Sequence, residues 1–166
     1  MWFEMRKENV SFVQRAPVVH LSEAVVAAPR ALVFAAFAEP RSWQHWFPNV
    51  RDASYTGAAP YGVGTIREAH VGGTYWREEM IAWKEGSQLT WTVTHASVPF
   101  AKAQVESFEF IEAASGTCVR WTLALEPRLL ARLGAPLARG VITRLLRRAM
   151  RNLTVHLQHQ SRSEAG

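Results

Sequence analysis

The stretch PRSWQHWFPNV, from Pro40 to Val50, gathers two tryptophans, a phenylalanine, a histidine and two prolines into eleven residues. A solvated loop seldom carries so many aromatic rings, because they would leave a large apolar area in water. Trp43 and Trp46 are three residues apart, so a short helix over residues 41–46 would place both rings on one face and His45 on the other. We therefore expect the stretch to cover one end of an apolar interior, with His45 in solvent.

The length and composition predict a single soluble domain. The chain has 166 residues, of which 48% are hydrophobic and 20% charged, enough for one sizeable core and too few for two domains. No apolar run approaches the roughly 20 residues of a membrane helix, and the first residues lack the order of a secretory signal. The single cysteine, Cys118, excludes an internal disulfide. We expect a cytoplasmic protein with an N-terminal arm at 1–16, one domain at 17–160 and a tail at 161–166.

The excess positive charge is concentrated near the C-terminus. The net charge is +5, and residues 128–166 carry eight arginines against one acidic residue. Two interpretations stay open: a solvated helix face whose arginine stems cover apolar neighbours, or a face that meets an anionic surface. The second predicts salt-sensitive binding that is abolished by a charge swap at Arg144, Arg147, Arg148 and Arg151. Basic residues do not alternate with exposed aromatics, so nucleic acid is not an expected partner, and neither is membrane insertion.

The apolar pattern predicts a sheet followed by a long helix. A β-branched strand at 18–26 precedes a helix that begins at Pro29, and about six strands follow between residues 50 and 126. An apolar stripe of about six turns then runs from Leu137 to Leu157 and includes Val141. Such a stripe must be buried, and the sheet offers the only large surface that could bury it.

The paired glycines Gly72 and Gly73 separate two strand-like runs. This pattern is typical of a two-residue hairpin turn, because glycine adopts positive φ without strain. The register set by such a turn places Arg67 opposite Glu78, an oppositely charged pair on one face of the hairpin.

This order of elements resembles the START-like (SRPBCC) superfamily, in particular its bacterial polyketide cyclase/dehydratase-like branch. The resemblance covers roughly residues 18–160 and is carried by AAPRALVFAAFAEPRSWQHWFPNV (27–50), GVGTIRE (62–68), SGTCVRW (115–121) and the closing amphipathic helix. It implies an α+β helix-grip fold of the START/Bet v 1-like kind. In this fold a curved antiparallel sheet of about six or seven strands surrounds a long C-terminal helix. Two short helices follow the first strand, and a cavity lies between sheet and helix.

The resemblance directs attention to the side chains on the inward sheet face. The family's strand is usually apolar at the positions of Arg67 and Met80, so we expect their face of the hairpin to point inward. Alternation along residues 88–95, continued to the strand end, places His95 on the cavity side. On a later strand, Glu106 is two residues from Phe108 and therefore shares its inward face. The residues expected to contact a ligand are Trp46, Arg67, Trp76, Glu78, Met80, Trp91, Phe108, Trp121, Leu137 and Val141.

Two functions stay open for such a cavity. The first is binding of a small hydrophobic or aromatic molecule, such as a lipid, polyketide or isoprenoid-like compound, because the inward side chains are mostly aromatic. The alternative is a polyketide cyclase/dehydratase-like enzyme that moves a proton with His95, Glu106, Arg67 or Glu78. The histidines show no metal-ligand spacing, and no dinucleotide or phosphate-binding glycine motif is present, so we expect neither a metal nor another cofactor.

Overall fold

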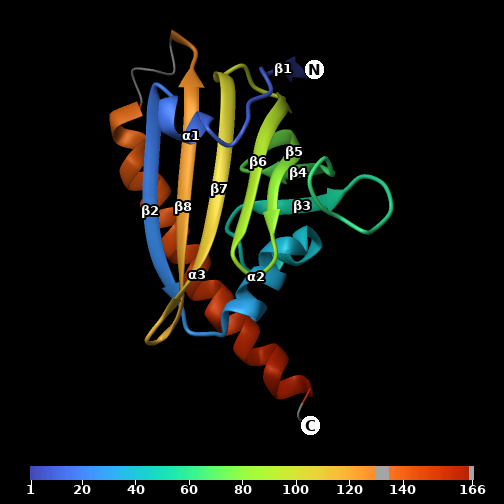
Figure 1. The fold of residues 1–166 in the computed structure, drawn as a ribbon, viewed down its shortest axis with the longest axis vertical. Coiled ribbons are helices and arrows are strands. Elements are labelled where there is room, and N and C mark those ends of the chain that lie inside the picture. Colours follow the sequence, from blue (N-terminus) through green and yellow to red (C-terminus); the bar gives the residue numbers. More distant parts are fainter. Residues whose placement is uncertain (130–134, 165–166) are drawn as a thin grey trace.

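The computed structural model shows a curved antiparallel sheet with a long helix behind it (Figure 1). It describes residues 1–129 and 135–164, and the side chains of the last helix from 140 to 160. The strands are β1 (Phe3–Glu4), β2 (Val18–Val26), β3 (Val50–Tyr55), β4 (Ile66–Val71), β5 (Thr74–Lys84), β6 (Gln88–Ala96), β7 (Ala101–Ala113) and β8 (Gly116–Pro127). Their order in the sheet is β2-β8-β7-β6-β5-β4-β3, and β1 pairs with β6. All described pairs are antiparallel.

The helices of the described residues are α1 (Phe12–Arg15), α2 (Arg30–Ala38) and α3 (Ala135–Glu164), with the 3₁₀ helix η1 (Pro40–His45). The α+β helix-grip architecture expected from the sequence is therefore confirmed, including the two short helices after the first long strand. The second of these is a 3₁₀ helix, which Pro40 opens and whose first turn the Glu39 carboxylate caps by accepting from Arg41 N. Helix α3 continues four residues into the segment that we expected to be a tail.

The β4–β5 hairpin has the register predicted from its two glycines. Gly72 and Gly73 have φ angles of 59° and 80°, the positive values that a primed two-residue turn requires. Arg67 lies opposite Glu78, as predicted, and Met80 is fully buried on the same face. The face that carries the charged pair therefore points into the molecule.

One stripe of α3 packs against the inner side of the sheet. Its buried side chains recur at helical spacing and are Leu146, Ala149, Met150, Leu153 and Leu157. The expectation that Val141 faces the cavity is wrong, because its side chain is 62% exposed. At about 100° per residue, Val141 lies about 140° around the helix from Leu146. Leu137 lies outside the residues whose side chains are described.

Four arginines of α3 lie on its exposed side, and within the described part of the chain no ion pair involves them: Arg144, Arg147, Arg148 and Arg151. An anionic surface as the partner of this face stays a prediction. Among the described helices, none is both long and apolar enough to cross a bilayer.

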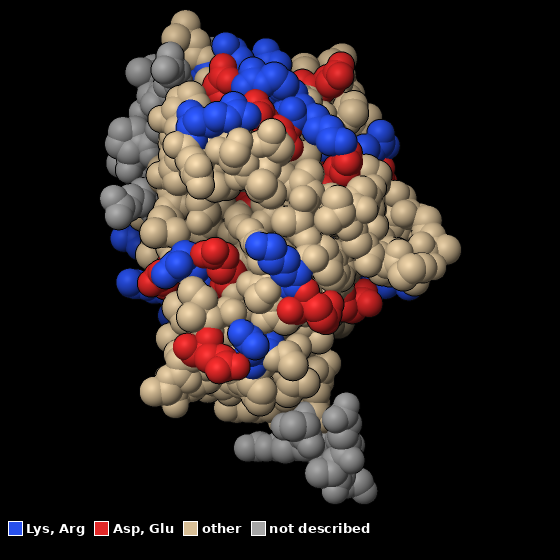
Figure 2. All heavy atoms as spheres, in the orientation of Figure 1, with Lys and Arg blue, Asp and Glu red and all other residues tan. Residues whose placement is uncertain are grey.

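The N-terminal segment packs on the outer face of the sheet. Strands β6 and β7 pair directly only over residues 88–92 of β6. Beyond residue 92 the N-terminal segment lies between them and hydrogen-bonds to both strands. Met5 N donates to Thr94 O and Arg6 N to Lys102 O, both at 2.8 Å. Phe12 is buried against small apolar side chains of β7 and β8. Figure 2 shows basic and acidic side chains mixed along the upper edge of the molecule. Arg6 of the N-terminal segment contacts the carboxylates of Glu8 and Glu126 at 2.8 and 2.7 Å.

Candidate functional site

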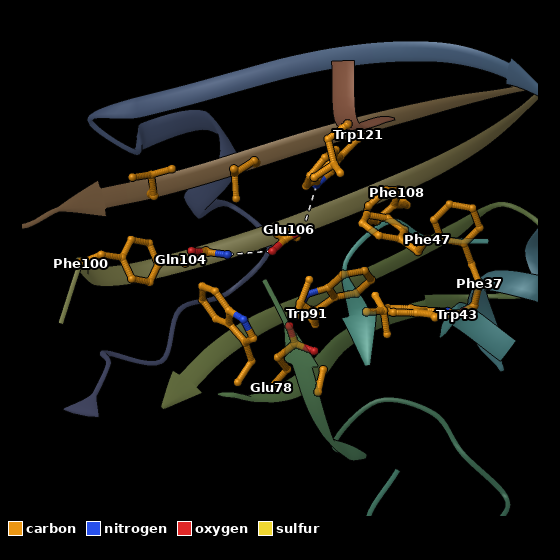
Figure 3. A pocket seen from close by; sticks show the side chains of 17 residues that line it. Phe37, Trp43, Phe47, Glu78, Trp91, Phe100, Gln104, Glu106, Phe108 and Trp121 are labelled. Carbon is orange, nitrogen blue, oxygen red and sulfur yellow. Dashed lines mark hydrogen bonds between the residues drawn. The ribbon is translucent and has the colours of Figure 1, made fainter. Parts of the chain in front are cut away.

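A cavity of about 250 Å³ lies between the inner face of the sheet, α3 and the two short helices (Figure 3). Seventeen side chains line it, and three of these are polar: Glu78, Gln104 and Glu106. Six are aliphatic, and eight are aromatic, namely Phe37, Trp43, Phe47, Trp76, Trp91, Phe100, Phe108 and Trp121. The lining is therefore apolar, with a few convergent polar groups, which is the composition of small-molecule sites.

Three of the aromatic rings form a stack that crosses the sheet. Trp91 on β6 stacks on Phe108 of β7, with ring centroids 5.2 Å apart and planes 21° apart. Phe108 stacks in turn on Trp121 of β8, at 5.3 Å and 15°. The antiparallel register places Phe108 directly opposite Trp121, so the strands themselves position the rings. Each ring supports the next, and the cavity wall is pre-formed.

Glu106 is the polar group at the centre of this wall. It projects inward from β7, and each of its carboxyl oxygens accepts one hydrogen bond, Oε1 from Gln104 Nε2 at 2.7 Å and Oε2 from Trp121 Nε1 at 3.0 Å. Figure 3 shows it between these two donors, with Glu78 across the cavity. Burial, and secondarily the nearby Glu78 carboxylate, raise the pKa of Glu106 from 4.5 to about 7. A group with this pKa can hold or release a proton near neutral pH.

The raised pKa of Glu106 makes the stability of the protein depend on pH. The folded state binds the proton more tightly than the unfolded state, so this contribution is complete below pH 4.5 and is lost as pH rises through about 7. The loss amounts to at most about 3 kcal/mol. Glu106→Gln removes the ionisable group, so we expect the variant to be more stable than the wild type at pH 8 and no more stable at pH 4.5. Urea unfolding at the two pH values measures the difference, and a stability gain that is equal at both would contradict the assignment.

Behind Glu78 lies the only fully buried guanidinium among the described residues, that of Arg67. Its side chain is 0% exposed, and its Nε donates to Glu78 Oε2 at 2.7 Å. The Arg67 Cζ atom lies 4.2 Å from the centre of the Trp43 ring and 4.0 Å from that of Trp91, so the cation contacts two adjacent rings. A desolvated cation–π contact contributes about 2 kcal/mol. Held by these rings, Arg67 in turn holds the Glu78 carboxylate at the cavity wall.

The hydrogen-bonding capacity of Arg67 is incompletely used. Its Nη2 approaches Glu78 Oε2 to 2.7 Å but lies outside hydrogen-bond geometry, and Nη1 has no partner. The buried Nε1 of Trp91 has no partner either. Such groups are uncommon in protein interiors, and they lie close to the cavity.

The structure brings together half of the residues expected to contact a ligand. Those that line the cavity are Trp76, Glu78, Trp91, Phe108 and Trp121. Arg67 lies one layer behind them, in contact with Glu78.

Two further expected residues do not line the cavity, and each is a correction. Trp46 is buried against Phe37, at a ring distance of 4.9 Å, and its backbone carbonyl accepts from Asn152 of α3. Its neighbour Trp43 lines the cavity instead. Met80 is fully buried in the core and is absent from the wall. In both cases the aromatic and aliphatic packing around the residue leaves it no free surface.

His95 does not face the cavity, contrary to the sequence expectation. The pairing of β5 with β6 shifts by one residue between Arg77 and Glu78, so that no residue of β5 lies directly opposite Thr94. This bulge reverses the alternation of side chains beyond it. The His95 ring meets the edge of Trp2 on the outer face, 6.3 Å away, so His95 is removed from the candidate acid/base groups.

Sequence reasoning missed several residues of the wall, among them Phe37, Trp43, Phe47 and Phe100. They lie on the short helices or in connections, where no strand alternation applies. The aromatic density of the Pro40–Val50 stretch was the available signal for two of them. No signal singled out Phe100, which precedes β7.

A cavity held between a curved antiparallel sheet and one long helix defines a protein of the START/Bet v 1 type. Residues 19–158 match the family described as polyketide cyclase / dehydrase and lipid transport. The chain belongs to this family, which confirms the resemblance seen in its sequence.

Individual proteins are similar over nearly the same length. An uncharacterized protein of Mycobacterium tuberculosis is 26% identical over 153 residues, which are 91% of each chain. A START superfamily protein from Mycobacterium smegmatis has a TM-score of 0.66 at 13% identity, covering 86% of this chain and 97% of that one. The ginseng major latex-like protein 151 from Panax ginseng has a TM-score of 0.63 at 15% identity, covering 83% and 95%. At these identities the two solved structures support the fold alone.

Proposed function

We propose that the protein binds one small, compact, hydrophobic or aromatic molecule in the cavity between sheet and α3. The observation that carries the proposal is the lining itself, in which fourteen of seventeen side chains are aliphatic or aromatic. A ligand that fills this cavity removes apolar surface of the wall and of the ligand from water, which gives binding a favourable free energy.

The chemical class follows from the shape and composition of the wall. The volume of about 250 Å³ lies just below the range typical of drug-sized ligands, so a compact ring system fits better than a long acyl chain. Polyketide or isoprenoid-like compounds of two or three rings have this form. Proteins of the START/Bet v 1 type bind hydrophobic ligands, which supports the same class.

The alternative function is proton transfer to or from a bound ligand, as in a polyketide cyclase or dehydratase. Glu106 favours it, because a carboxyl group with a pKa of about 7 lies in an otherwise apolar cavity. Binding is the stronger proposal, because Glu106 is the one wall residue in the described part whose pKa is shown to be shifted. Conversion of a ligand that Glu106→Gln still binds but no longer converts would support the enzyme.

Native mass spectrometry of the protein purified from its own host tests binding. We expect a mass excess of one small molecule, which organic solvent extracts. The extracted compound, added back to emptied protein, should raise the melting temperature by several degrees, because it binds only the folded state. Binding would be contradicted if the purified protein carried nothing and no small aromatic compound raised its melting temperature.

A further inference from the structure

The polar groups that face the cavity are mostly hydrogen-bond acceptors. Of the three polar side chains on the wall, two are carboxyl groups, Glu78 and Glu106. The third, Gln104, already donates its amide N–H to Glu106, and the indole N–H of Trp121 donates there too. These two donors of the wall are therefore used internally, and the Nε1 of Trp91 is buried without a partner, while carboxyl oxygens remain open to the cavity.

The positive charge near the cavity is committed to Glu78. Arg67 is fully buried and does not line the cavity, and its Nε and Nη2 both lie 2.7 Å from Glu78 Oε2. The rings of Trp43 and Trp91 both contact the guanidinium. Among the described residues, no Lys or Arg lines the cavity. The hydrogen bond that Glu78 accepts from Arg67 involves Oε2 alone. Glu78 Oε1 is available to a ligand, whereas the Arg67 cation is not.

This arrangement discriminates between ligands of equal size. A carboxylate ligand would approach two carboxyl groups in a mostly apolar cavity without an available counter-ion, and like-charge repulsion there weakens binding on the order of 100-fold. A hydroxyl group would donate to a carboxylate oxygen, a hydrogen bond to a charged acceptor that strengthens binding by about tenfold or more.

We propose that the ligand of this cavity carries an uncharged hydroxyl group at its polar end, which donates to Glu78 or Glu106, and that carboxylate ligands are excluded. The inference rests on the proposed binding function and specifies the chemical class of the ligand. A phenol or an alcohol on a compact ring system satisfies it, and a fatty or aromatic acid does not.

The discrimination depends on pH through Glu106. The charged groups described around Glu106 are Glu78 on β5 and Arg67 on β4. Because the pKa of Glu106 is raised to about 7, the cavity gains one negative charge between pH 5.5 and pH 8. Rejection of a carboxylate is therefore stronger at pH 8.

Three probes of one ring system test the proposal: naphthalene, 2-naphthol and 2-naphthoate, titrated into the full chain and followed by tryptophan fluorescence. At pH 8 we expect 2-naphthol to bind about tenfold more tightly than naphthalene and at least about 100-fold more tightly than 2-naphthoate. At pH 5.5 the ratio of 2-naphthol affinity to 2-naphthoate affinity should be about tenfold smaller than at pH 8. The Glu106→Gln variant should show this smaller ratio at both pH values.

The matched control is Glu109→Gln, the same substitution on the same strand with the side chain on the outer face, where it pairs with Arg120. It should leave the affinity ratios and their pH dependence unchanged. Binding of 2-naphthoate as tight as that of 2-naphthol at pH 8 would overturn the inference and leave the binding function intact. If naphthalene and 2-naphthol both fail to bind, the proposed function fails first. The pH series on the wild type decides the matter even if Glu106→Gln does not fold.

Discussion

Replacing Arg67 with methionine is expected to lower the free energy of unfolding by about 3 to 5 kcal/mol. The substitution leaves the Glu78 carboxylate, whose side chain is 8% exposed, without the cation that it contacts at 2.7 Å. It also removes the guanidinium's contacts with the rings of Trp43 and Trp91. Urea unfolding at pH 7, with the midpoint and slope fitted together, measures the loss.

The same hairpin supplies a matched control. Arg77 and Glu68 form the second charged pair of the register, at 2.7 Å, on the opposite face. Their side chains are 40% and 42% exposed, so Arg77→Met should cost less than about 1 kcal/mol. An equal loss for Arg67→Met and Arg77→Met would contradict the buried-pair interpretation.

The double variant Arg67→Met/Glu78→Leu separates the cost of an orphaned charge from the value of the pair. Removing both charges leaves no uncompensated ion, and apolar replacement of a buried pair is often neutral. We expect the double variant to be more stable than Arg67→Met alone. If the double variant instead loses the sum of the stabilities lost in Arg67→Met and in Glu78→Leu, the two groups contribute independently. That result would contradict the interpretation of Arg67 and Glu78 as a coupled pair.

Filling the cavity with a larger side chain is the second change with a large expected effect. Leu123 of β8 lines the cavity beside the aromatic stack and is partly exposed to the empty space. Leu123→Trp should weaken binding of naphthalene-sized probes by at least about 100-fold, because the indole occupies the volume that the ligand needs. Stability should change little, since the added atoms enter a void rather than a packed region. Fluorescence titration and thermal unfolding measure the two effects.

The control for this experiment is Leu21→Trp on β2, whose side chain is 50% exposed on the outer face. It adds the same atoms where no ligand is proposed to bind and should leave probe affinity unchanged. Wild-type affinity in Leu123→Trp would show that the probes bind elsewhere on the protein.

The parts of the fold that were predicted correctly rest on local rules. The Gly72–Gly73 turn determined the register of its hairpin, because a two-residue loop leaves the strands one way to pair. The spacing of leucines from residue 146 to residue 157 determined which face of α3 is buried. Alternation placed Glu106 on the inner face of β7, where the structure has it.

The expectations that failed rest on rules continued past the point where they hold. The alternation that placed His95 inward ends at the bulge beside Thr94, and one unpaired residue is enough to reverse it. The apolar stripe that the sequence predicts on α3 includes Val141, but the part of the helix surface that the sheet buries is narrower and leaves Val141 exposed. Trp43 lies in η1 and Trp46 directly follows it, but packing against α2 and α3 decided which of them lines the cavity.

The sequence by itself determined the family, the order of elements, the hairpin register and the presence of Arg67 and Glu78 as a facing pair. These features follow from the spacing of residues that are close in sequence, either along one helix or strand or across one tight turn. Only the tertiary structure decided that the pair is buried with Arg67 against two tryptophan rings, and that Glu106 lies between two donors in an apolar cavity. Burial and the resulting pKa of Glu106 depend on side chains from several strands that meet only in the folded sheet, and no sequence spacing encodes such a meeting.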